Sequence, residues 1–109
     1  FPDYYETEHE IFVHGMVDPD LPLTEQDTNE FRWRKFEDVR PHISGKQVIC
    51  GHTSQKSGRP LNLQHSICID TNACRGGWLT CLDVAGEVAH QTSEAGEYRM
   101  LDMNSLVED

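Results

Sequence analysis

The sequence predicts an α/β (α+β) fold in which a mostly antiparallel β-sheet has helices packed beside it. Short apolar runs rich in β-branched and aromatic residues recur along the chain, and such runs are typical of strands. They lie at 11–13, 48–50, 66–70, 78–84 and 88–92. The last three follow one another through short turns that contain glycine, as antiparallel strands do. One other segment, 24–36, has the residues of a helix start.

Composition bounds the size and the partners of the protein. The chain has 109 residues, of which 37% are hydrophobic, and we interpret 1–109 as one domain or part of one, with a modest core. Its 19 acidic and 9 basic residues give a net charge of -10, which argues against nucleic-acid and anionic-membrane partners. No run approaches the roughly 18 apolar residues of a membrane span, and the first residues lack the order of a signal peptide. We therefore expect a cytoplasmic protein.

Two of the predicted strands end in a histidine beside a glycine. The first and second strands lead into His14-Gly15 and Gly51-His52. Ligand sites in α/β sheets gather at the carboxyl ends of strands, glycine lets a ligand approach the backbone, and neutral imidazole is the commonest metal ligand. Either histidine alone is equally well explained as a hydrogen-bonded residue at a strand end. The pair favours a shared metal site, and we predict that His14 and His52 converge.

The predicted helical segment carries most of the positive charge. Residues 24–27 have the composition of a helix start, and Asp27 or Thr28 is the expected cap of a second helix that runs through Phe36. Five of the nine basic residues follow the first histidine strand: Arg32, Arg34, Lys35, Arg40 and Lys46. They form either a solvated helix face or an anion clamp, because guanidinium can hold two phosphate oxygens at once.

The other segments are predicted as loops and chain ends. Residues 1–10 are acidic and aromatic and look like the end of a preceding element, and 53–60 form a polar loop after His52. Residues 71–77 form a glycine-ended turn. The acidic tail 93–109 is only weakly periodic, so we expect it to be irregular or helical.

The four cysteines indicate a reduced protein without a structural zinc knuckle. No Cys-x-x-Cys pair occurs. Cys50, Cys68 and Cys81 lie within apolar runs, and we predict that all three are buried free thiols. Cys74 lies in the glycine-ended turn and is not included in that prediction.

Three elements of the chain occur together in a recognisable order. They are the strand and loop at 11–15 and 18–21, the strand end Gly-His-Thr at 48–53, and the strand and turn at 67–71 and 76–80. In this order they resemble the calcineurin-like metallophosphoesterases, and within them the bacterial serine/threonine protein phosphatase branch. The resemblance covers 11–84 and implies half of a four-layer αββα sandwich. It also implies that the turn 71–77 overhangs a metal centre.

The resemblance implies roles for particular residues. His14 and His52 would be ligands of the second ion in a centre of two divalent metal ions (Mn, Fe or Zn). Such a centre hydrolyses a phosphoprotein or a small phosphoester. Arg34 looks like the family's phosphate-holding arginine, with Arg32 and Arg40 as alternatives.

The chain departs from the family in its upstream part. The family motifs Gly-Asp-x-His-Gly, Gly-Asp-x-x-Asp-Arg-Gly and Gly-Asn-His-Glu do not occur in it, so the catalytic acid is expected in a missing upstream half. We therefore expect this chain to be the C-terminal half of the domain and to be inert alone. We also expect one apolar sheet face to be partly bare. That face is built by Ile11, Val13, Val48, Cys50, Ile67 and Ile69.

Two other functions fit the same residues. A dinucleoside polyphosphate hydrolase of the same superfamily shares the metal ligands and differs in how it holds its substrate. A non-catalytic binding module would use His14 and His52 structurally. A comparison of the activity on a phosphopeptide with the activity on a dinucleoside tetraphosphate distinguishes the two enzymes. Metal binding that depends on the histidines distinguishes either enzyme from the binding module.

Overall fold

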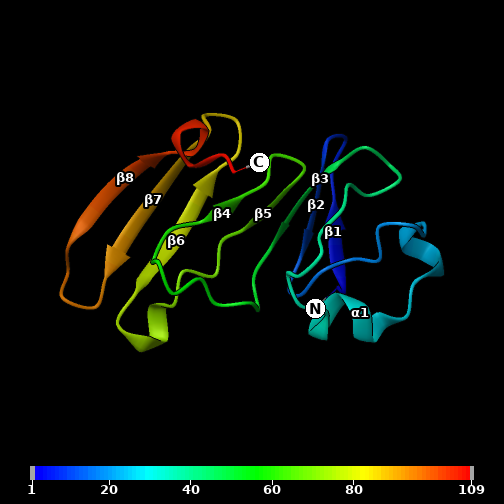
Figure 1. Ribbon diagram of the computed structural model, residues 1–109, viewed down its shortest axis with the longest axis horizontal. Helices are drawn as coiled ribbons and strands as arrows, with labels where there is room; N and C mark the ends of the chain where they lie inside the picture. Colours follow the sequence, from blue (N-terminus) through cyan, green and yellow to red (C-terminus); the bar gives the residue numbers. More distant parts are fainter. Residues whose placement is uncertain (1, 109) are drawn as a thin grey trace.

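The computed structural model describes residues 2–108, and its strands form two sheets (Figure 1). The larger sheet has the order β1-β2-β3-β5-β4. Its strands are β1 (Tyr4–Glu6), β2 (Glu10–Val13), β3 (Gln47–Cys50), β4 (Leu61–Asn62) and β5 (Ser66–Cys68). The smaller sheet, ordered β6-β7-β8, consists of β6 (Trp78–Asp83), β7 (Val88–Ser93) and β8 (Tyr98–Asp102).

Helix contributes little to the described part of the chain. It comprises α1 (Thr28–Trp33) and three short 3-10 helices at Leu23–Glu25, Ala73–Arg75 and Met103–Leu106. The predicted α+β character, with strands predominating, is therefore confirmed.

The centre of the larger sheet is parallel. Strand β3 pairs in parallel with both β2 and β5, and only the outer strands β1 and β4 are antiparallel to their neighbours. The prediction of a mostly antiparallel sheet is correct for β6–β8 and wrong for the sheet that carries the histidines. The reason is the connection 14–46, which is long enough for the crossover that parallel strands need.

One face of the larger sheet is closed by the segment that follows β2. The sheet contributes Ile11, Val13, Val48, Cys50 and Cys68. These side chains pack against Met16, Val17, Leu23, Phe31 and Phe36. The prediction that this face is bare is therefore wrong, because the helical segment folds back over it.

The opposite face of the larger sheet is covered at β5 and at Ile49 of β3, which is 4% exposed. Ile67, also predicted to be bare, is 4% exposed and packs with Ala89 and Met103, and half-buried Ile69 joins the same cluster. These contacts dock the smaller sheet against β5. Figure 1 shows the smaller sheet at the end of the molecule away from α1, so β1 and β2 lie beyond its cover.

Three local predictions need correction. Residues 1–10 contain β1, and the tail 93–109 contains β8 and a 3-10 helix, although neither strand was expected. Helix α1 ends at Trp33 rather than at Phe36. The helix is capped by Asp27, whose side chain accepts a hydrogen bond from the backbone N–H of Asn29. Asp27 was one of the two caps predicted.

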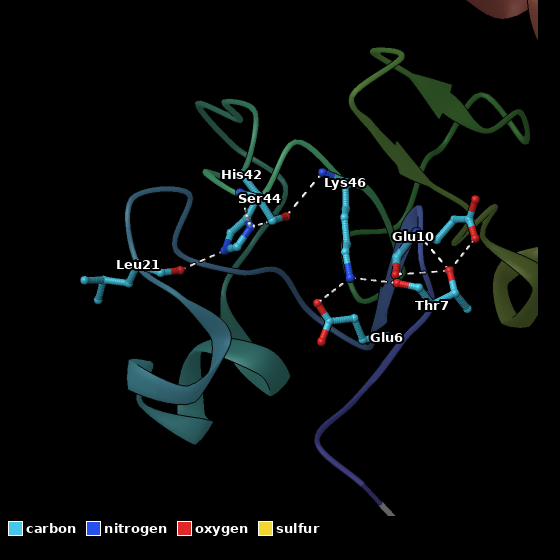
Figure 2. Close-up of polar contacts among 7 residues, drawn as sticks. All are labelled: Glu6, Thr7, Glu10, Leu21, His42, Ser44 and Lys46. Carbon is cyan, nitrogen blue, oxygen red and sulfur yellow. Dashed lines mark hydrogen bonds and ion pairs between the residues drawn. The ribbon is translucent and has the colours of Figure 1, made fainter.

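Polar contacts hold the long connection between β2 and β3 in place (Figure 2). The Lys46 ammonium donates to a Glu6 carboxylate oxygen and to the Thr7 carbonyl, both at 2.7 Å, which ties the entry of β3 to the β1–β2 hairpin. Buried His42 contacts the Leu21 carbonyl through Nε2 at 2.7 Å. Lys46 is therefore engaged by Glu6 and Thr7.

Gly15 is required by close approach of the backbone. Its N–H donates to the Phe31 carbonyl at 2.6 Å, and an added Cβ would lie 2.9 Å from backbone atoms of Phe31 and Arg32. Gly51 differs, since an added Cβ would meet only the His14 carbonyl at 3.5 Å and the Asp70 side chain at 3.9 Å.

These two glycines give a matched pair of variants. We expect Gly15→Ala to lower the free energy of unfolding by about 1–3 kcal/mol, because the helix end must move away from the strand. We expect Gly51→Ala to stay within about 0.5 kcal/mol of the wild type. Urea denaturation followed by circular dichroism measures both. Equal destabilisation by the two substitutions would contradict the close approach at Gly15.

Candidate metal centre

The two predicted histidines lie side by side at the carboxyl ends of β2 and β3. His14 follows β2 directly, and the Gly51 N–H donates to the His14 carbonyl at 2.8 Å, which extends the parallel ladder past the strand ends. His52 adopts a left-handed backbone conformation with φ of 63°. The imidazole centroids of His14 and His52 are 5.1 Å apart. The predicted convergence of the two side chains is confirmed.

The C-terminal end of α1 forms a wall beside this pair. The Trp33 ring lies edge-on to the His52 ring at 5.7 Å, while 66% of Trp33 is exposed. The Phe36 N–H donates to the Thr53 hydroxyl at 2.8 Å and joins the chain after α1 to the loop after His52. Sequence reasoning missed Trp33, although an aromatic residue at the end of a short helix, beside the arginines, was a signal for it.

The donor set of the histidine pair is incomplete within residues 2–108. No group of three or more histidine, cysteine, aspartate or glutamate side chains that could hold a metal ion occurs there. Asp70 lies near Gly51, but its carboxylate accepts from the Ser54 hydroxyl at 3.4 Å and from the Asn72 N–H at 3.3 Å. Within the described residues, the pair therefore has no third side chain of these four kinds placed to share an ion with it.

An open groove of about 910 Å³ lies beside His14 on the uncovered face of the larger sheet. Its floor is apolar and is built by Tyr5, Phe12, Ile49 and Ile69. Tyr5 pairs in register with Phe12, and Phe12 with Ile49, so the three form a row across the sheet. A partly bare apolar face therefore exists at Tyr5 and Phe12, which were not in the predicted set. In β2, the predicted Ile11 and Val13 point to the opposite face, because successive strand residues alternate. Ile69, which was predicted, does line the groove.

The three candidate arginines lie in different surroundings. Arg32 lines the groove together with His14 and contacts an Asp3 carboxylate oxygen at 3.2 Å. Arg34 is paired with Glu30 at 2.5 Å and lines a separate hollow.

Arg40 is engaged elsewhere on the surface. It is paired with Asp20 at 2.8 Å, and its hydrogen bond holds the pKa of the Asp20 carboxyl below its ordinary value. Of the three arginines, the structure brings only Arg32 to the groove beside His14.

The turn 71–77 is held against β6. The Thr71 hydroxyl donates to the Trp78 carbonyl and contacts the Thr80 hydroxyl at 2.5 Å, and Gly77 approaches the Thr71 and Asn72 carbonyls. None of the residues lining the groove belongs to this turn. The structure therefore does not bring the turn to the groove beside His14.

The cysteines divide into a buried pair and two exposed thiols. Cys50 and Cys68 are buried free thiols in register on β3 and β5, as predicted. The hydrogen bond to Cys68 and burial raise the pKa of the Cys50 thiol above its ordinary value. Cys81 is exposed, so the prediction of a buried thiol there is wrong, since it lies on the outward side of β6. Cys74 is also exposed.

Comparisons with protein-family models, with curated proteins and with solved structures find no match for this chain. Of the helices in residues 2–108, none has the length and hydropathy needed to cross a bilayer.

The division of the thiols predicts their reactivity. In the folded protein, we expect an alkylating reagent to modify Cys74 and Cys81 and to leave Cys50 and Cys68 unmodified, because the reagent cannot reach the core and a raised pKa keeps Cys50 protonated. Mass spectrometry of proteolytic peptides reads out each site. Labelling in urea is the control and should modify all four. Modification of Cys50 as fast as Cys81 without denaturant would disprove the burial of the pair.

Proposed function

We propose that this chain contributes part of the site of a metal-dependent phosphoester hydrolase of the serine/threonine phosphoprotein phosphatase type, in which His14 and His52 bind one divalent ion. The observation that carries the proposal is the convergence of the two rings, at 5.1 Å, at the carboxyl ends of adjacent parallel strands. A hydrogen-bonded structural role would leave their ring nitrogens with protein partners, and neither ring has a side-chain hydrogen bond among those of the described residues.

Two imidazoles suit a divalent ion, but they are only part of the ligand set that such an ion needs. Catalytic zinc sites use three or more protein ligands for each ion, so the other ligands and the catalytic acid come, in this proposal, from outside residues 2–108. When bound, a pair of divalent ions polarises phosphoryl oxygens and lowers the pKa of a bridging water. The role of this chain is to hold one ion against the edge of β2 and β3 through neutral imidazole nitrogens.

The groove supports the finer proposal that the larger sheet is half of an αββα sandwich. Its apolar floor includes exposed Tyr5 and half-buried Phe12, and Arg32 and Trp33 of α1 line the groove beside His14. A contiguous apolar surface of this kind marks a face that packs against another element. A second sheet on this face would bring its own strand ends beside His14.

Within this proposal the phosphate-holding residue is Arg32. It shares the groove with His14, and its guanidinium is 61% exposed with one carboxylate neighbour, Asp3. Arg34 is paired with Glu30, one helical turn earlier in the chain, and lines a hollow other than the groove.

Paramagnetic Mn²⁺ tests the metal site directly. We expect titration of the 109-residue chain with Mn²⁺ to broaden the imidazole NMR signals of His14 and His52 first, because line broadening falls steeply with distance from the ion. The signals of His9 and His65 are internal controls in the same spectrum. Substitution of His52 by alanine should abolish the effect on His14, whereas His9→Ala should leave it unchanged.

The outcomes separate the candidate functions. Selective broadening that depends on both histidines supports the metal site. Uniform broadening, or none, would establish a structural role for His14 and His52 and thereby favour a non-catalytic binding module. Rapid Mn²⁺-dependent hydrolysis of a phosphomonoester by this chain alone would also overturn the proposal, because two ligands would then suffice.

Anion binding distinguishes the two arginines. In the presence of Mn²⁺ we expect Arg32→Ala to weaken inorganic phosphate binding by about tenfold, the cost of one charge-assisted hydrogen bond. Arg34→Ala, the matched control, should leave the phosphate affinity unchanged. Isothermal titration calorimetry measures both. A larger loss from Arg34→Ala would return the role to that residue.

A further inference from the structure

The outward face of the smaller sheet carries three metal-binding side chains in one row. Cys81 on β6 is in register with His90 on β7, and His90 is in register with Met100 on β8. Residues directly opposite each other on antiparallel strands point to the same face, with Cβ atoms about 5 Å apart. The sheet therefore presents a thiol, an imidazole and a thioether side by side.

Burial in the core does not explain this row. Cys81 is exposed and Met100 is 61% exposed, whereas Ala89 and Gln91, which flank His90, are fully buried on the other face. A solvent-facing sheet surface is ordinarily polar. Figure 1 shows that the smaller sheet forms one end of the molecule, away from the candidate centre at β2 and β3.

The geometry allows the three side chains to converge above His90. The central position of His90 places each sulfur side chain one strand away. Methionine has three rotatable side-chain bonds and can extend across that spacing. The Tyr98 hydroxyl lies 2.7 Å from His90 Nδ1, and the two rings stack at 6.1 Å. This contact orients the imidazole and leaves Nε2 for a ligand, which is the arrangement found around metal-bound histidines.

We propose that Cys81, His90 and Met100 form a binding site for Cu(I), with Tyr98 as a positioning residue. Thiolate and thioether sulfur are soft donors that select Cu(I), and imidazole also binds copper. Zn²⁺ is a weaker fit, because thioether is not among its usual protein ligands. On binding, the Cys81 thiol loses its proton to solvent, and the copper stays in the cuprous state throughout.

Carboxylates at one end of the row support binding of a cation. The next row on the same face, two residues along each strand, consists of Asp83, Val88 and Asp102. Asp83 accepts the Gly86 N–H and Asp102 accepts the Asn104 N–H. Both aspartates are exposed, so their charges reach solvent on this side of the sheet. This site is separate from His14 and His52 and does not rest on the proposed phosphoesterase function.

Anaerobic competition with a chromophoric Cu(I) chelator tests the site in the whole 109-residue chain. We expect the chain to bind one Cu(I). Cys81→Ser should lower the Cu(I) affinity by more than about 100-fold. Met100→Leu, which removes a weaker ligand, and Tyr98→Phe, which removes an orienting partner, should each lower it by about tenfold. Cys74→Ser is the matched control, because it removes the other exposed thiol, and it should leave the affinity unchanged. His52→Ala should also have no effect.

A second measurement excludes simple thiol binding. The copper X-ray absorption spectrum should show two sulfur donors and one nitrogen donor in the wild type, and one sulfur fewer in Met100→Leu. Identical spectra in the two proteins, an equal loss from Cys74→Ser, or Zn²⁺ binding that matches Cu(I) in affinity would each overturn the proposal. Far-ultraviolet circular dichroism of every variant confirms that the sheet is intact.

Discussion

The parallel pairing of β2 with β3 is the constraint on which the rest of the larger sheet depends. It puts the ends of both strands at one edge, and the Gly51 N–H bond to the His14 carbonyl carries the register beyond the last ladder pair. A parallel pair requires a crossover, and here that crossover is the segment that closes the core. The fold of residues 14–46 and the convergence of His14 with His52 therefore have a single cause.

The loop after His52 is fixed at both ends by different parts of the molecule. At its start, Thr53 accepts the Phe36 N–H. Near its end, the Gly58 carbonyl accepts from fully buried Gln91 at 2.8 Å and from Arg99 at 3.0 Å, and the Arg99 guanidinium lies 4.0 Å from the Trp78 ring centre. The smaller sheet thus helps to hold the loop that follows His52, as well as covering Ile67.

Local chemistry made part of this structure predictable. Asp27 caps α1 through its own side chain, and the glycine-bounded hairpin between β6 and β7 forms within a few residues. Pairing between distant strands could not be read in the same way. A continuous apolar run such as 48–50 identifies a buried strand, but the direction of its neighbours depends on how 14–46 crosses the sheet.

The features that the sequence did not predict, such as strand β1 and the exposure of Cys81, also depend on contacts between distant parts of the chain. Strand β1 is only three residues long, and its pairing is supported from a distance by the contact of Lys46 with Glu6. For Cys81, alternation along β6 identifies two faces, but both carry apolar residues, so the sequence does not indicate which one is buried. The His-Gly and Gly-His strand ends could be recognised in the sequence, but their meeting depends on the parallel pairing of β2 with β3, which the prediction of a mostly antiparallel sheet did not include. The choice among the arginines depends on their carboxylate partners Asp3, Glu30 and Asp20.

The open groove and the pair of His14 and His52 lie at the same edge of the molecule. The groove runs over Tyr5 and Phe12 to His14, so an element that covers the apolar floor must also approach the imidazole pair. Burial of that floor would remove water from around the histidines, and a metal-bound charge is less screened in such surroundings. In the proposed enzyme, completion of the hydrophobic contact and completion of the metal site are therefore one structural step, driven mainly by the apolar surface and directed by His14 and His52.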